Sequence, residues 1–131
     1  MEKLQNLDQI RARNALNFSK KGAVAGKEGG EVIKKVPPLV LNHGLLATAA
    51  YSFTERGAWP EVFDAIAQHL ADPDINVIPR ECGDRSKMLD HLTSDKATSE
   101  TLKIATSETM AWLNFARRFV RKEDSNREDR N

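Results

Sequence analysis

Apolar residues recur three and four positions apart toward the end of the chain, which is the repeat of one face of an α-helix. The repeat consists of Leu102, Ala105, Thr109, Trp112, Leu113, Ala116, Phe119 and Val120. Roughly opposite this stripe fall Lys103, Ser107, Asn114, Arg118 and Arg121, with Arg117 on its flank. We therefore predict a long amphipathic helix, begun by capping residues in 94–98, that buries its stripe against other helices.

The same repeat predicts four earlier helices. We expect a first helix from Asn6 or Asp8 to Phe18, a second over 39–54 begun by Pro37 and Pro38, a third over 60–71, and a short fourth helix after Asp84 through Leu92. Residues 75–84 are expected to form a connection, with room for a short extended piece. No second core and no internal repeat is evident.

Residues 20–36 are rich in glycine and lysine, and we predict a mobile basic loop there. The segment after Asp124 has no apolar residue, so a disordered tail is expected over 125–131. Together these patterns predict an all-α protein. It is a single-domain helical bundle of about five to six helices over 1–124, with the basic loop following the first helix.

Arg11 projects into the apolar stripe of the first helix. The favoured interpretation is structural: its aliphatic stem lies on the core while its guanidinium pairs with a carboxylate. A functional role for Arg11 is the minority alternative.

Bulk charge does not indicate a nucleic-acid or membrane partner, because 20 Lys and Arg stand against 19 Asp and Glu, a net charge of +1. The distribution is more informative. Basic residues concentrate in 20–35 and near the end of the last helix, whereas 55–74 is acidic. Aromatic residues make up only 6% of the chain, which disfavours a platform of stacked bases and leaves phosphates as the expected contact.

The candidate RNA-binding residues are Lys20, Lys21, Lys34, Lys35, Arg117, Arg118, Arg121 and Lys122. The plainer interpretation is that these cations keep a surface hydrated and favour the dipole at a helix C-terminus.

Catalytic and metal-binding patterns are missing from the sequence. The three histidines are far apart and none neighbours Cys82, so neither a zinc site nor an activated thiol is expected. The glycine-rich GKEGGE does not have the spacing of a phosphate-binding P-loop. We therefore predict a protein that is not an enzyme and needs no cofactor, metal or small-molecule substrate. With one cysteine and no apolar leader or spanning segment, it is expected in the cytoplasm, without a membrane partner.

Three segments resemble a known family. VPPLVLNHGLLATAAYSFTERG (36–57), ATSETMAWLNFARRFV (105–120) and the Arg11-Ala12 pair with Leu16 are similar, in order and separation, to elements of the small helical subunit, subunit five, of the CRISPR type III-B Cmr RNA-silencing complex. The chain departs from that pattern at Leu102-Lys103 and by the extra residue His43.

The resemblance implies a non-catalytic subunit of a ribonucleoprotein that acts in antiviral defence against foreign nucleic acid. Its implied partners are the backbone and large Cmr subunits, copies of itself in a filament, and the guide and target RNA along which it stacks. The alternative is a helical protein–protein assembly module without direct RNA contact. A helical DNA-binding regulator is less compatible, because the last helix concentrates arginine at its C-terminal end and not its N-terminal end.

Overall fold

The computed structural model describes the backbone of residues 6–20 and 27–130, and the side chains of residues 6–20 and 30–119. Its helices are α1 (Leu7–Ser19), α2 (Lys27–His43), α3 (Leu45–Tyr51), α4 (Trp59–Ala71), α5 (Arg85–Leu92) and α6 (Ser99–Arg130), with a short 3₁₀ turn, η1 (Arg80–Cys82). The described residues include no strand, so the prediction of an all-α fold with about six helices is confirmed.

Side-chain caps set several of the predicted boundaries. Asn6 caps α1 in a reciprocal capping box, in which its side chain accepts from the Gln9 amide and its own amide donates to the Gln9 side chain. The Asp84 carboxylate accepts from the Lys87 amide at the start of α5. The Thr98 hydroxyl accepts from the Thr101 amide at the start of α6. These helix starts confirm the predictions from sequence.

The prediction of a basic loop over 20–36 is wrong from Lys27 onward, because α2 begins there; residues 21–26 lie outside the described part. Val32, Ile33, Val36 and Val40 are buried, and burial of this stripe outweighs the unfavourable helix propensity of the neighbouring glycines.

The prediction that Pro37 and Pro38 begin a helix is also wrong. Both lie inside α2, where each lacks the amide hydrogen that would bond to a carbonyl four residues earlier. The helix expected over 39–54 is instead divided at Gly44, whose φ of 91° and ψ of 162° interrupt the helical path before α3.

Residues 125–130 are helical in the structure, contrary to the predicted disordered tail. Residues 99–130 contain neither proline nor glycine, so nothing in the local sequence ends α6.

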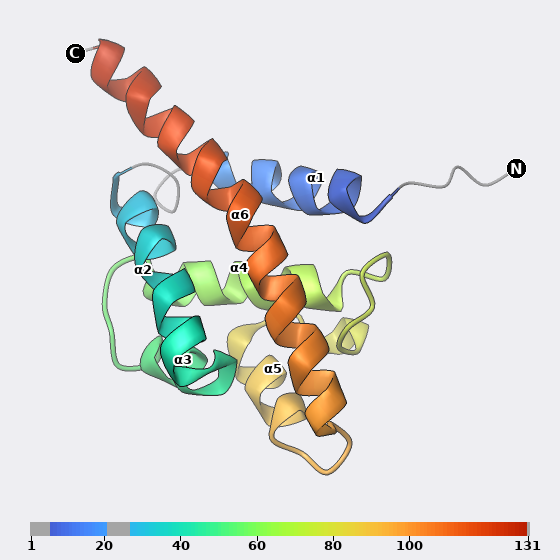
Figure 1. The fold of residues 1–131 in the computed structure, drawn as a ribbon. Coiled ribbons are helices and arrows are strands. Elements are labelled where there is room, and N and C mark those ends of the chain that lie inside the picture. The colour runs from blue at the N-terminus through green and yellow to red at the C-terminus, as the bar shows by residue number, and fades with distance from the viewer. Residues whose placement is uncertain (1–5, 21–26, 131) are drawn as a thin grey trace, which may run out of the picture.

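The long helix α6 crosses the molecule diagonally and packs against α1, α2 and α4 (Figure 1). The predicted stripe is confirmed at its centre, where Trp112, Leu113 and Ala116 are at most 1% exposed. The rings of Phe18 and Trp112 meet edge to face, with their centroids 5.5 Å apart. Buried residues from all six helices form one contiguous cluster, which fixes α1, α2 and α6 relative to one another.

Candidate nucleic-acid interface

The candidate cations that the structure describes lie on α2, on α6 and directly after α1. Lys20 directly follows α1, Lys34 and Lys35 lie on α2, and Arg117 and Arg118 lie on α6. All five side chains are exposed. Of the other candidates, Lys21 lies outside the described residues. Arg121 and Lys122 belong to the helical backbone of α6, but their side chains lie outside the described part.

The helical repeat turns these cations away from the core. On α2, Lys34 and Lys35 occupy the gap between the buried Ile33 and Val36. On α6, Arg117 and Arg118 follow the buried Ala116, and both are exposed. For Arg117 and Arg118 this agrees with the predicted outer side of the last helix, whereas Lys34 and Lys35 were expected in a loop and lie on a helix.

None of these five cations, which we call the exposed cations, makes an ion pair within the part of the chain that the structure describes. Other basic residues do: Arg11 pairs with Glu108, Arg13 with Asp72, and Arg85 with Asp64. α2 packs against α6, and Figure 1 shows the start of α2 and the C-terminal half of α6 at the same end of the molecule.

A buried polar network joins α1, α4 and α6 behind this surface. The Glu108 carboxylate on α6 accepts from Nε and Nη2 of Arg11, both at 2.7 Å, and lies 2.9 Å from Nε2 of His69. Asn14 Nδ2 lies 2.9 Å from both His69 Nδ1 and Asp72 Oδ2. The network confirms the structural interpretation of Arg11.

The hydrogen bonds of Asn14 define the proton positions on His69. A carboxylate only accepts, so the Asn14 atom facing Asp72 must be the amide nitrogen, and the same nitrogen donates to His69 Nδ1. Because Nδ1 is an acceptor, His69 is neutral and donates from Nε2 to Glu108.

The pKa directions agree with this arrangement. Burial lowers the pKa of His69 and outweighs the attraction of Glu108. For Glu108, burial opposes ionisation, but the hydrogen bonds from Arg11 and His69 hold its pKa below the ordinary value. For Asp72, burial is likewise outweighed by hydrogen bonds from Asn14 and the Asp74 amide, and its pKa is lowered.

This network is missing from the sequence-based predictions, which single out neither His69 nor Glu108. His69 is 2% exposed and lies inside the bundle. The sequence does contain a signal for the Arg11–Glu108 pair. Each residue interrupts an apolar stripe, and two opposite charges on buried helix faces are expected to pair with each other.

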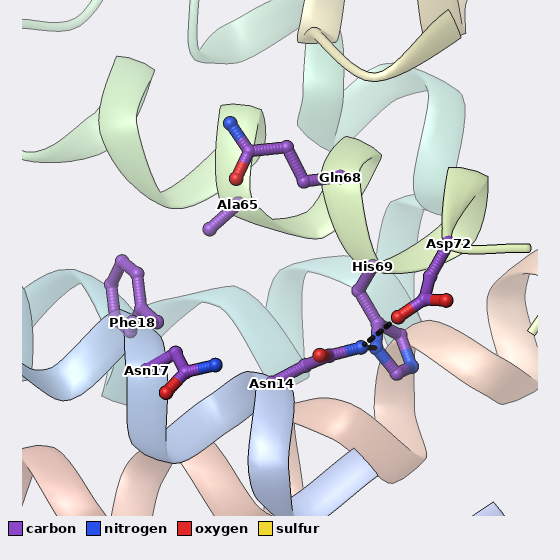
Figure 2. A pocket seen from close by; sticks show the side chains of 7 residues that line it. All are labelled: Asn14, Asn17, Phe18, Ala65, Gln68, His69 and Asp72. Atoms are coloured by element: carbon purple, nitrogen blue, oxygen red, sulfur yellow. Dashed lines mark hydrogen bonds between the residues drawn. The ribbon is translucent and has the colours of Figure 1, made fainter. Parts of the chain in front are cut away.

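A cavity of about 250 Å³ lies between α1 and α4, next to the network. Asn17 and Phe18 of α1 line it together with Ala65 and Gln68 of α4, and Figure 2 shows Asn14 reaching across to His69 and Asp72. Three carboxamides, a neutral imidazole and a carboxylate thus surround a space whose apolar walls are Phe18 and Ala65.

The described residues offer little support for catalytic or metal chemistry. They contain no group of three His, Cys, Asp or Glu placed to hold a metal ion. Burial, with Glu81 nearby, raises the pKa of the Cys82 thiol, which leaves it protonated and weakly nucleophilic. The Asp72 carboxylate accepts from the Asp74 amide, which is ordinary turn chemistry.

Across the same described residues, no helix combines the length and hydrophobicity that crossing a bilayer requires.

Comparison with protein families gives a match to the family described as CRISPR-associated protein (Cas_Cmr5) over residues 7–123. The match extends from the beginning of α1 into the C-terminal part of α6, and so includes every helix of the bundle. Comparisons with curated proteins and with solved structures gave no match. The family match covers most of the 131 residues and confirms the resemblance seen in the sequence: the chain belongs to the Cas_Cmr5 family, the small subunits of the CRISPR Cmr complex.

Proposed function

We propose that this Cmr subunit is a non-catalytic RNA-binding element of a cytoplasmic ribonucleoprotein. In this proposal it stacks with copies of itself and with the backbone and large subunits, and its cations lie along the phosphates of guide and target RNA. The effector acts in antiviral defence against foreign nucleic acid.

The observation that carries the proposal is the position of the exposed cations: four of the five lie on α2 and α6, which pack against each other, and the fifth directly follows α1. Five cationic side chains on α2, on α6 and after α1 lack an acidic partner among the described residues, although that part of the chain contains many exposed carboxylates. Lys and Arg arranged along adjacent helices suit a phosphate backbone, which repeats one negative charge per nucleotide and carries no sequence information.

A second candidate, an assembly module without direct RNA contact, has its own support. Leu41, Tyr51 and Phe53 are 73%, 44% and 47% exposed on and near α2 and α3. Arg85 lies over the Phe53 ring, 4.3 Å from its centroid. Exposed apolar and aromatic groups of this kind suit contact with a protein neighbour.

The two candidates differ in one experiment on the reconstituted Cmr complex. In the test variant, Lys34, Lys35, Arg117 and Arg118 are replaced by Ala. RNA retention should fall, and the dependence of log affinity on log salt should flatten by roughly 0.7 to 0.9 for each phosphate that no longer has a cationic partner.

A matched control replaces Arg56, Arg80, Lys96 and Lys103 by Ala. These residues are also exposed and make no ion pair within the described residues, so the control removes the same charge from other parts of the surface. RNA retention should be preserved in the control. Equal retention by the wild type and the test variant, with normal assembly, would favour the assembly module and reject RNA contact through these residues.

A further inference from the structure

The cavity between α1 and α4 is not used by the proposed phosphate contacts, and its lining is chemically specific. Asn17 and Gln68 line it from different helices, and both residues are exposed and make no side-chain hydrogen bond within the described part of the chain. Each carboxamide offers a donor beside an acceptor. They suit a ligand that presents the complementary donor and acceptor along one edge.

The third carboxamide is held in a fixed orientation. The nitrogen of Asn14 donates to both Asp72 and His69, so its oxygen is left as an acceptor beside the cavity. The described residues that line the cavity include no cation, because His69 is neutral, and their one carboxylate, Asp72, is already engaged by Asn14, Arg13 and the Asp74 amide. The part of a ligand that enters must therefore be polar but uncharged.

The walls and the size of the cavity restrict that ligand further. Phe18 and Ala65 provide apolar surface, which favours a flat ring. A volume of about 250 Å³ is smaller than the roughly 300–1,000 Å³ of ordinary small-molecule sites. One ring system fits, whereas a dinucleotide does not.

An exposed cation, Lys20, directly follows the part of α1 that lines the cavity. Lys20 follows the last residue of α1, and its backbone amide donates to the Asn17 carbonyl one helical turn earlier. Because residues three apart lie on the same side of a helix, the exposed Lys20 extends the Asn17 side of α1 at its C-terminal end.

We propose that this cavity binds a single nucleobase through Asn17 and Gln68, while Lys20 holds the attached phosphate. Every nucleobase has a donor beside an acceptor on its pairing edge, so the site accepts different bases. The source is either a nucleotide of an RNA strand or a free nucleoside monophosphate. The RNA-strand form of the proposal rests on the proposed function.

The experiment uses the ¹⁵N-labelled full chain and three probes: adenosine monophosphate, a short RNA, and the same sugar–phosphate strand without bases. We expect the first two probes to shift the side-chain amide resonances of Asn17 and Gln68. The strand without bases should bind roughly tenfold more weakly than the RNA, since it has no base to place in the cavity. In the variant N17A/Q68A this difference should disappear.

The control variant is N42A/S107A, which removes two exposed polar groups from α2 and α6 and should behave like the wild type. If the wild type binds RNA and the baseless strand equally, the base site is overturned while the phosphate contacts stand. If neither strand binds but adenosine monophosphate shifts both amides, the RNA proposal fails and the nucleotide site stands. Shifts produced only by another Cmr subunit would overturn the site in favour of a protein contact.

Discussion

Glu108 occupies a position on α6 whose neighbours along the helix face, Ala105, Thr109 and Trp112, are at most 1% exposed. A carboxylate is tolerated there because two donors from Arg11 and one from His69 replace the water that it loses. The sequence predicted that Arg11 would find a carboxylate. It did not identify the partner, because residues 97 positions apart are brought together only by the packing of α1 on α6.

Replacement of Arg11 by Met should destabilise the fold by about 3 kcal/mol, because it leaves the Glu108 charge buried with only His69 as a partner. The variant R11M/E108Q should recover most of this stability, since a neutral amide still accepts from His69. Urea unfolding followed by circular dichroism measures both variants. R117M, which removes an exposed cation outside the network, is the control and should change stability by less than about 0.5 kcal/mol. Equal stability of R11M and R117M would contradict the network.

Stability should fall with acidification in two stages. The His69 pKa is lowered by folding, so below its ordinary value of 6.5 the unfolded chain binds a proton that the native chain excludes. The pKa values of Glu108 and Asp72 are also lowered, from ordinary values of 4.5 and 3.8, and their contribution disappears at still lower pH. Melting temperatures measured from pH 8 to pH 3 should therefore be level above about pH 7 and decline below about pH 6.5.

His69→Gln should remove the first stage, because it eliminates the titrating group while keeping a donor for Glu108. His91→Gln, at a partly exposed position of α5, is the control and should preserve both stages. A first stage that persists in H69Q would assign it to another group.

At the scale of elements, the sequence correctly predicted those helices in which the apolar stripe and the capping residue indicate the same starting point. α1, α4 and α5 begin where Asn6, Pro60 and Asp84 indicate. The sequence patterns gave the wrong prediction around α2, because the local residue preferences there oppose what burial in the bundle requires. Glycines and prolines predict a break, but the buried stripe of α2 requires a helix, and burial prevails.

The division between α2 and α3 depends on Gly44, whose φ of 91° and ψ of 162° fall in a region that only glycine readily adopts. Gly44→Ala should cost about 1–3 kcal/mol although no atom lies within 4 Å of the added Cβ, so the penalty arises in the backbone. Gly83→Ala is the matched control, since its φ of −80° suits alanine and the nearest atom is 3.8 Å away. Chemical denaturation compares them, and equal stabilities would show that the chain relaxes at Gly44.

At the scale of the whole molecule, the proposed RNA contact depends on where the cations lie and not on the net charge of +1. The helical repeat of α6 placed Arg117 and Arg118 off its buried stripe, but the sequence did not place Lys34 and Lys35 on a helix face, because it predicted a loop there. The sequence could not show that α2 packs against α6, since no local pattern encodes which helices become neighbours. Nor could it reveal the cavity, which is formed by residues of α1 and α4 that are about 50 positions apart.

A charge-relocation variant tests this conclusion directly. Lys34 and Lys35 are replaced by Ser, and Ser86 and Ser99 are replaced by Lys at exposed positions near the starts of α5 and α6. The net charge remains +1. Figure 1 shows these helix starts at the opposite end of α6 from the start of α2. If RNA follows α2 and α6, affinity should fall, and the salt slope of the complex should flatten by roughly 1.4 to 1.8 for two phosphates without a cationic partner.

The salt slope of the relocation variant separates overall electrostatic attraction from local pairing with phosphate, which alanine variants change together. Removal of a lysine lowers both the overall attraction for RNA and the local pairing with phosphate, whereas relocation changes only the local pairing. An unchanged slope in the relocation variant would therefore mean that RNA is held by diffuse charge or by other subunits. A reduced slope, with normal assembly and unchanged stability, would locate the RNA on the end of the molecule where α2 begins, because only the position of two charges differs between the proteins.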